Sequence, residues 1–246
     1  MSLGSARIVA DQIRIKPKTV LGLATGSTPL GLYNELIKLH KNEGLDFSNV
    51  ISFNLDEYIG LSEDHPQSYK TFMEKKLFSK INIKQKNIHI PNGNSFNNKE
   101  CNKYESLIKS HDGIDLQILG IGSDGHIAFN EPSSSLGSRT RIKTLTQKTV
   151  NDNARFFDNI SDVPKYAVTM GVGTIMEAKK ILLLASGGSK AEPIAKAIEG
   201  PISSMCSASA IQMHPKTIVM IDEAAAKHLK EKDYYKWVYS NKIKLN

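Results

Sequence analysis

Five short apolar runs recur along the chain at the length of a β-strand. Their apolar character is nearly continuous and rich in β-branched residues, which predicts strands that are buried on both faces of a sheet. Two further segments, "TRIKTL" near Thr140 and "YAVTMG" near Val168, predict additional strands. The five runs are Thr19–Ala24, Val50–Leu55, Asp115–Gly122, Lys180–Ala185 and Thr217–Asp222.

The segments between these runs have apolar residues at three- and four-residue spacing, which predicts amphipathic helices. They are Thr28–Lys41, Gln67–Lys80, Asn98–Ser110, Lys190–Glu199 and Glu223–Lys230. Strand and helix therefore alternate, which is typical of an α/β fold: a Rossmann-like, mostly parallel twisted sheet with helices on both faces. No long polar linker divides the 246 residues, so we expect a single domain over residues 1–246.

The net charge of +7 changes this picture little, because the lysines are scattered among acidic residues instead of forming one basic block. We interpret the charge as a solvated surface that attracts small anions, and we expect no nucleic-acid partner. The tail "KEKDYYKWVYSNKIKLN" interleaves bases with aromatic residues. We interpret it as a terminal helix whose aromatic side chains dock on the body of the protein.

Several classes of protein are disfavoured by what the chain lacks. No apolar stretch approaches the ~18 residues that span a membrane, and the N-terminus does not resemble a signal peptide, so we expect a cytoplasmic protein without a membrane partner. The two cysteines, Cys101 and Cys206, have neither a CxxC partner nor a histidine at zinc-ligand spacing. This pattern indicates neither a disulfide framework nor a structural zinc site.

Polar, glycine-rich motifs follow four of the predicted strands: "TGSTP", "DEYIG", "SDGH" and "SGGSK". In an open α/β sheet, ligands bind in the crevice beyond the carboxyl ends of the strands. We therefore expect these four motifs, distant in sequence, to meet in one cleft.

Two of these motifs are suited to a phosphate group. Thr25, Gly26, Ser27 and Thr28 lie between a strand and a helix, where hydroxyls, free backbone N–H groups and the helix dipole favour an anion. An ordinary N-cap turn explains this motif about equally well. Lys190 occupies a second such turn, where a cation is unfavourable unless an anion lies nearby, although a lysine that extends into water also fits.

The other two motifs supply acids and a histidine. Asp56 and Glu57 end a buried strand, and neighbouring residues point to opposite sides, so we expect one of the two carboxylates in the cleft as a general base. In "GSDGHIAFNEP", Asp124 and Glu131 flank His126, an arrangement that holds a histidine in one tautomer. We expect no metal, because further ligands at suitable spacing are missing. These residues predict proton-transfer chemistry on a small phosphorylated compound without naming it.

The order of the motifs resembles the glucosamine-6-phosphate deaminase family. The resemblance runs from about residue 20 to residue 223 and includes "LGLATGSTP", "FNLDEYIGL", "LGIGSDGHIAFNEP", "NARFFDN" and "SGGSKA". It implies a reaction of amino-sugar catabolism without an organic cofactor: glucosamine 6-phosphate and water become fructose 6-phosphate and ammonia. It also implies that His126, oriented by Asp124 and Glu131, opens the sugar ring, and that Asp56 moves a proton between carbons 2 and 1. Lys190 and Arg155, with the hydroxyl-rich turns, would hold the phosphate.

Some members of that family carry a second phosphate site between subunits. Four positions here match it: Ser134, Arg141, Lys143 and Thr144. The C-terminal tail that completes the site in those members does not align with this chain. The resemblance thus leaves two alternatives open, an allosteric homo-hexamer and a non-allosteric monomer.

Two other functions compete with the deaminase. A 6-phosphogluconolactonase shares the "GxDGH" loop but continues toward "SLFP", where this chain has "IAFNEP", so Glu131 is the discriminating residue. A sugar-phosphate-binding regulator keeps the pocket without turnover and commonly loses a catalytic group. All four candidate groups are present here, which favours the enzyme.

Overall fold

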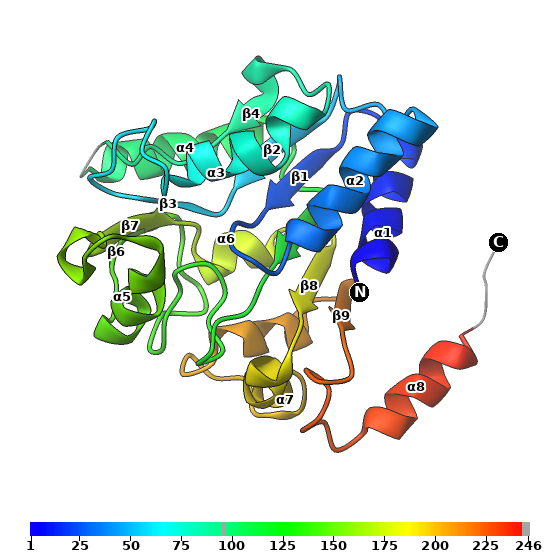
Figure 1. Cartoon of the computed structure of the whole chain (residues 1–246). Helices are drawn as coiled ribbons and strands as arrows, with labels where there is room; N and C mark the ends of the chain where they lie inside the picture. Colours follow the sequence, from blue (N-terminus) through cyan, green and yellow to red (C-terminus); the bar gives the residue numbers. More distant parts are fainter. Residues whose placement is uncertain (95–96, 243–246) are drawn as a thin grey trace.

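Two sheets organise the computed structural model, which describes residues 1–94 and 97–242. Within these residues, six parallel strands form the main sheet in the order β4-β2-β1-β5-β8-β9, and three antiparallel strands form a smaller sheet in the order β3-β7-β6 (Figure 1). The strands are β1 (Val20–Leu23), β2 (Ile51–Asn54), β3 (Asp56–Tyr58), β4 (Ile88–His89), β5 (Leu116–Leu119), β6 (Arg141–Thr144), β7 (Tyr166–Thr169), β8 (Ile181–Ala185) and β9 (Thr217–Ile221).

Helices connect the strands and cover both faces of the main sheet. The α-helices are α1 (Ser2–Ile15), α2 (Leu30–Glu43), α3 (Tyr69–Lys76), α4 (Asn98–Ser110), α5 (Gln147–Asn153), α6 (Val172–Met176), α7 (Ala191–Glu199) and α8 (Lys232–Ser240). The 3-10 helices are η1 (Phe78–Lys80), η2 (Gln85–Asn87), η3 (Ala154–Phe156), η4 (Ile160–Asp162), η5 (Gly188–Lys190) and η6 (Ser207–Met213). No helix in the described ranges is long and apolar enough to cross a membrane.

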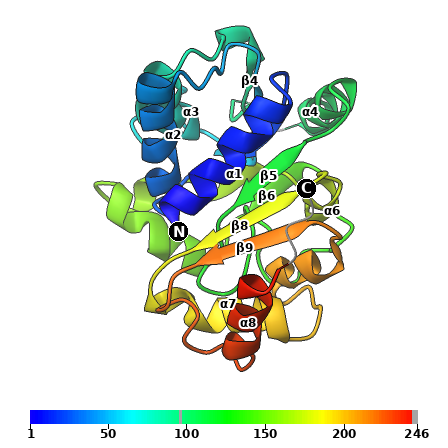
Figure 2. The same ribbon diagram turned by 90° about the vertical axis from the view of Figure 1, so that its right-hand side faces the viewer.

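Alternate residues of each strand pack into two separate cores, as the two-residue period of a strand requires. On one face, residues such as Leu116 and Leu182 pack with α1, α2 and α3, and α1 lies across the sheet in Figure 2. On the other face, residues such as Leu119 and Leu183 pack with α4, α6, α7 and η6. The predicted single-domain, mostly parallel α/β fold with helices on both faces is confirmed.

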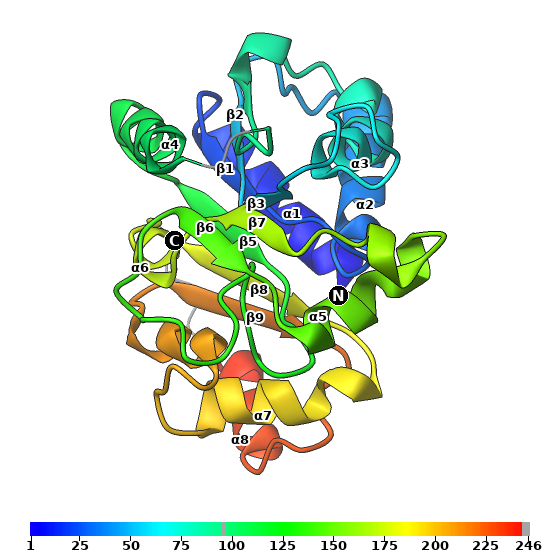
Figure 3. The ribbon, with the colours of Figure 1, turned by 90° about the vertical axis from the view of Figure 1, so that its left-hand side faces the viewer.

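The smaller sheet extends the carboxyl end of β2. Only Leu55 separates β2 from β3, so the chain leaves the main sheet and immediately pairs with β7. The segments predicted as strands near Thr140 and Val168 form β6 and β7 of this sheet, which lies in front of the main sheet in Figure 3. Asp56 pairs with Thr169, which pairs in turn with Arg141, so the small sheet fixes the position of Asp56.

Three expectations for the C-terminal region are wrong. β9 is an edge strand and not buried on both faces; Ile218 is 38% exposed. Glu223–Lys230 forms turns instead of a helix, because Asp222 accepts the N–H of Ala225 and isolated turns follow. The tail does form a helix, α8, but Trp237 and Tyr239 do not dock on the body: they are 64% and 80% exposed, and α8 projects from the body in Figure 1. The last four residues of the tail lie outside the described residues.

The exposure of α8 predicts that its tryptophan contributes little to stability. Trp237→Ala should change the free energy of unfolding by less than about 0.5 kcal/mol, as expected for an exposed side chain. Phe53→Ala, at a fully buried position, should cost about 3–5 kcal/mol. Urea unfolding of both variants measures this difference, and equal losses would contradict the exposed position of α8.

Candidate functional site

Four loops line one edge of the main sheet because the strands that precede them are neighbours. β2, β1, β5 and β8 lie side by side and run parallel. The segments at their carboxyl ends therefore follow in the same order: Asp56, Thr25–Pro29, Gly122–His126 and Ser186–Lys190. The strand order reverses between β1 and β5, which is the switch point where α/β sheets bind ligands. The predicted convergence of the four motifs at one edge is confirmed.

The histidine of the β5 loop is held by the neighbouring aspartate. His126 Nδ1 lies 2.6 Å from Asp124 Oδ1, and the backbone N–H of His126 donates to the same oxygen. Burial opposes ionisation of Asp124, but the hydrogen bonds and charge of His126 outweigh it and lower the pKa of Asp124 to about 2. An ionised Asp124 only accepts hydrogen bonds, so Nδ1 carries the proton and Nε2 is the basic nitrogen.

Two glycines allow this loop to close around the histidine. Gly125 has φ +89°, in the left-handed region that other residues rarely adopt. A Cβ added to Gly122 would overlap the imidazole ring of His126, so only glycine leaves room for the ring. The backbone N–H of Gly122 also donates to the carbonyl of His126 at 2.8 Å. The loop thus fixes both the backbone and the ring of His126.

Asp56 is the buried acid of the site. Its side chain is enclosed where β3 meets β7, and the residue is 6% exposed. Burial, followed by the charge of Glu57, raises the pKa of Asp56 to about 8. A carboxyl group of this pKa gains and loses a proton near neutral pH, as a general base requires.

Glu57 points away from Asp56 to the start of α3. Its carboxylate accepts the backbone N–H groups of Tyr69 and Lys70, each at 2.9 Å, and also that of Tyr58. Burial raises the pKa of Glu57, while these three N–H groups favour the charged form. The position of Glu57 at a helix N-terminus is favourable for an acid. Asp56 and Glu57 therefore face different surroundings, and which of them acts as the general base stays a prediction.

Glu131 contacts Thr146 and not His126. Its oxygens accept the backbone N–H of Thr146 at 2.9 and 3.0 Å and the Thr146 hydroxyl at 2.9 Å. Thr146 is the N-cap of α5, and a carboxylate at a helix N-terminus satisfies free N–H groups there. Of the two acids expected to orient His126, Asp124 is the one that bonds the ring, and Glu131 connects the β5 loop to α5.

The turn after β1 does not use the hydroxyls of Ser27 and Thr28 to cap the helix that follows. Pro29 occupies the N-cap position of α2 without a side-chain hydrogen bond, so Ser27 and Thr28 do not cap the helix. Gly26 has φ +92°, which shapes the turn. Thr25 forms a side-chain hydrogen bond with Tyr69, whose pKa is raised by burial. The ordinary N-cap explanation of this motif therefore does not hold.

Lys190 lies at the second turn with its ammonium group directed inward. Lys190 Nζ donates to the carbonyl of Ile121 at 2.7 Å, next to the β5 loop. Burial lowers the pKa of Lys190, the charges of Asp152 and Asp124 oppose this shift, and the positive charges of Lys148 and Arg155 add to it. The extension of Lys190 into water is thus excluded, and Arg155 and Lys148 add positive charge near its ammonium group.

Lys148 is a cation near this site that the sequence interpretation missed. It is exposed on α5, donates to the Ser123 hydroxyl in the β5 loop, and pairs with Asp152 at 3.1 Å. Lys148 lies on α5 and Arg155 on the next element, η3, seven residues further along the chain. Its closeness in sequence to Arg155 is the signal that could have identified it.

The four positions matched to a second phosphate site lie beside the β5 loop. Arg141 donates to the side-chain oxygen of Asn130 at 2.9 Å, and Lys143 and Thr144 follow on β6. The N–H of Ser134 donates to the carbonyl of Glu131, while the buried hydroxyl of Ser134 has no hydrogen-bond partner among the described residues. Among the described residues, no three His, Cys, Asp or Glu side chains gather as a metal-binding group.

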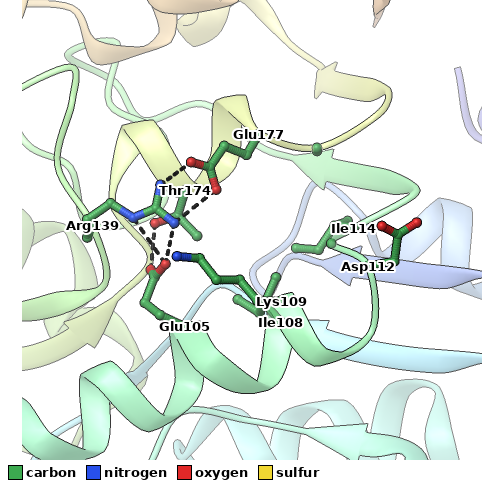
Figure 4. A pocket seen from close by; sticks show the side chains of 10 residues that line it. Glu105, Ile108, Lys109, Asp112, Ile114, Arg139, Thr174 and Glu177 are labelled. Atoms are coloured by element: carbon green, nitrogen blue, oxygen red, sulfur yellow. Dashed lines mark hydrogen bonds and ion pairs between the residues drawn. The ribbon is translucent and has the colours of Figure 1, made fainter.

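A charged cavity of about 220 Å³ lies at the opposite edge of the sheet. Its lining includes Asp112 and Ile114, which precede β5, and Ala178, which precedes β8. Arg139 bridges Glu105 and Glu177 across it (Figure 4). The pairing of Arg139 with Glu105 and Glu177 links the segment before β6 to α4 and to the end of α6, and the cavity lies away from the site.

Known proteins resemble this chain in sequence and in fold. The family model described as glucosamine-6-phosphate isomerases/6-phosphogluconolactonase matches residues 4–220. A glucosamine-6-phosphate deaminase of Thermoanaerobacter pseudethanolicus is 55% identical over 95% of this chain and 92% of its own, and one of Hahella chejuensis is 53% identical over 98% and 94%. A solved monomeric glucosamine-6-phosphate deaminase matches with TM-score 0.90 and 50% identity over 92% of this chain and 95% of its own.

A 6-phosphogluconolactonase from Thermotoga maritima also matches, with TM-score 0.67 and 24% identity over 89% of this chain and 95% of its own. At this identity the likeness concerns the fold alone.

The raised pKa of Asp56 predicts a stability that depends on pH. Between its ordinary pKa near 3.8 and about 8, the unfolded chain loses this proton while the folded protein keeps it, so the free energy of unfolding falls as pH rises. Asp56→Asn should therefore gain stability over the parent protein, by up to about 1.4 kcal/mol per pH unit. Urea unfolding from pH 5 to pH 8 measures this, with the exposed Asp158→Asn as the matched control. The same pH dependence in both variants would contradict the burial of an acid at Asp56.

Proposed function

The chain belongs to the glucosamine-6-phosphate isomerase/6-phosphogluconolactonase family, and we propose on this premise that it is a glucosamine-6-phosphate deaminase. It converts glucosamine 6-phosphate and water into fructose 6-phosphate and ammonia. The observation that carries this proposal is the buried Asp56, with a pKa of about 8, at the same edge of the sheet as the Asp124–His126 pair. Isomerisation of a cyclic sugar requires two groups that transfer protons. One moves protons at the ring oxygen and the carbon 1 hydroxyl, and the other moves the hydrogen bound to carbon.

Ring opening is the task of His126. The cyclic sugar opens when the hydroxyl at carbon 1 loses a proton and the ring oxygen gains one. Asp124 holds Nδ1–H of His126, which leaves Nε2 to exchange protons with the sugar. Glu131 supports this step through Thr146, by tying the loop to α5.

Asp56 then carries the isomerisation. Its carboxylate removes the hydrogen of carbon 2 from the open aldehyde, and the resulting enolamine receives that proton at carbon 1. The product is an imine at carbon 2, and water hydrolyses it to the ketone and ammonia. Burial favours this cycle because the protonated form of Asp56 is stable in the site until the proton is returned.

The 6-phosphate binds between the turn Thr25–Thr28 and the cations of the opposite loops. Lys190 and Arg155 supply positive charge, and an arginine grips a phosphate with two parallel hydrogen bonds. The unused hydroxyls of Ser27 and Thr28 and the N-terminus of α2 complete the site. Lys148 adds a third charge within the electrostatic range of Lys190.

The lactonase alternative is weaker on two grounds. The deaminases match this chain at 50–55% identity, whereas the lactonase from Thermotoga maritima matches at 24%. A lactone hydrolysis has no need of a buried carboxyl group with a raised pKa, and Asp56 is such a group. A non-catalytic regulator would not need to retain Asp56, Asp124, His126 and Glu131 together.

We further propose that the protein acts as a monomer in the cytoplasm. The monomeric deaminase with TM-score 0.90 supports this alternative over the hexamer. Arg141, which a second phosphate would need, is already bonded to Asn130 within the chain. Cys101 and Cys206 are both free and buried, which suits a reducing compartment.

Addition of glucosamine 6-phosphate should release ammonia and fructose 6-phosphate in equal amounts. Asp56→Asn should bind the substrate but lose about 10²–10⁴-fold in kcat, the contribution of a general base. Enzymatic detection of both products, with Asp158→Asn as control, measures this. Hydrolysis of 6-phosphogluconolactone without ammonia release would overturn the deaminase, and full turnover by Asp56→Asn would exclude Asp56 as the base.

Rate curves should be hyperbolic in glucosamine 6-phosphate, and the protein should elute as a monomer on sizing. Arg141→Ala should leave the shape of the curve unchanged, because a monomer has no second subunit to complete a regulatory site. A sigmoidal curve that Arg141→Ala makes hyperbolic, together with a hexamer, would contradict this proposal.

A further inference from the structure

A buried serine from a distant segment holds the turn between His126 and Glu131. Ser207 begins η6, and it is 1% exposed. Its hydroxyl donates to the carbonyl of Asn130 at 2.6 Å and accepts the backbone N–H of Ile127 at 3.2 Å. One side chain therefore bonds the first and the last residue of the four-residue turn that separates the two candidate catalytic residues.

The turn that Ser207 holds is strained. Ala128 has φ +49°, a left-handed conformation that is unfavourable for a residue with a Cβ and persists only where its surroundings impose it. Asn130 braces the same turn, with its side-chain amide donating to the carbonyls of Ile127 and Met170. Ser207 is thus one of the contacts that keep a strained backbone in place.

The residues next to Ser207 also contact the β5 loop, before and after the turn. The N–H of Ala208 donates to the carbonyl of Gly125 at 2.9 Å, and Cys206 Sγ lies 3.6 Å from that carbonyl. The N–H of Ser133 donates to the carbonyl of Ser204 beyond the turn. The segment 204–208 therefore contacts the loop on both sides of His126, although it touches neither Asp124 nor the His126 ring through these bonds.

We propose that Ser207 is a positioning residue of the reaction, whose hydroxyl sets the separation of His126 and Glu131 by holding the strained turn between them. This inference rests on the proposed function, because it assigns Ser207 to the ring-opening half of the site. Without the hydroxyl, a buried N–H and a buried carbonyl lose this partner, and Ala128 relaxes toward an ordinary conformation. His126 then shifts relative to the sugar.

The same 3-10 helix offers a matched control. Ser209 is fully buried, and its hydroxyl also joins a donor to an acceptor, the N–H and the carbonyl of Ser203. It differs from Ser207 in one respect that matters: its bonds stay within its own segment and do not reach the β5 loop.

Ser207→Ala should lower kcat by about 10²-fold, the loss that a misplacement of ~1 Å causes, with KM unchanged because Ser207 does not contact the phosphate-binding residues. Ser207→Thr keeps the hydroxyl and should recover most of the rate. Ala128→Gly in the Ser207→Ala protein should also recover activity, because glycine adopts the left-handed conformation without strain. Ser209→Ala should keep the kcat of the parent protein. We expect this even if Ser209→Ala and Ser207→Ala lower the urea midpoint of unfolding by the same amount.

Equal losses of kcat in the two alanine variants, or an unchanged kcat in Ser207→Ala, would overturn the inference. Where Ser207→Ala does not fold, Ser207→Cys, with a weaker hydrogen-bonding group of similar size, takes its place: a reduced kcat supports the inference and a parental kcat overturns it. Ammonia release by the parent protein is measured in parallel. Its absence counts against the deaminase itself, whereas the ratio between variants of an active enzyme tests Ser207.

Discussion

The burial of a carboxyl group at Asp56 is the constraint around which the site is built. A charged carboxylate is costly away from water, so Asp56 keeps its proton to about pH 8. Glu57, next in sequence, would add a second buried charge, and the fold compensates for it with three backbone N–H groups at the start of α3. Burial still raises the pKa of Glu57, but its three N–H donors favour the charged form, whereas Asp56 has no such donors among the described residues. Two adjacent carboxyl groups therefore differ in their surroundings.

The parallel sheet brings the other groups to the same edge. Because β2, β1, β5 and β8 are neighbours, Asp56, the Thr25–Thr28 turn, the Asp124–His126 pair and Lys190 follow one another along it. The small antiparallel sheet also fixes the position of Asp56, because Asp56 and Arg141 both pair with Thr169. Asn130 then connects Arg141 to the turn after His126. Asp56 and the β5 loop are thus fixed to a common framework.

Much of this arrangement could be predicted from the sequence, because it depends on local patterns. Buried strands show as continuous apolar runs, and the motifs after them identified Asp56, Asp124, His126 and Lys190. The helix predicted over Glu223–Lys230 was wrong because Asp222 ends β9 in a turn by accepting the N–H of Ala225, although Ala225 itself is buried. The exposure of α8 could not be predicted, because an amphipathic pattern predicts a helix but not the surface on which that helix packs. The contacts of Glu131 with Thr146 and of Ser207 with Asn130 join segments 15 and 77 residues apart, which only the tertiary fold brings together.

The central claim is that one buried carboxyl group moves hydrogen between carbons 2 and 1 of the sugar. Glucosamine 6-phosphate deuterated at carbon 2 tests it most directly, by single turnover and measurement of the label in fructose 6-phosphate. Because Asp56 is shielded from water, part of the deuterium should appear at carbon 1 of fructose 6-phosphate. With Asp56→Asn, the label should stay at carbon 2 of the unconverted glucosamine 6-phosphate. Loss of deuterium from carbon 2 at the parental rate in Asp56→Asn would contradict the account.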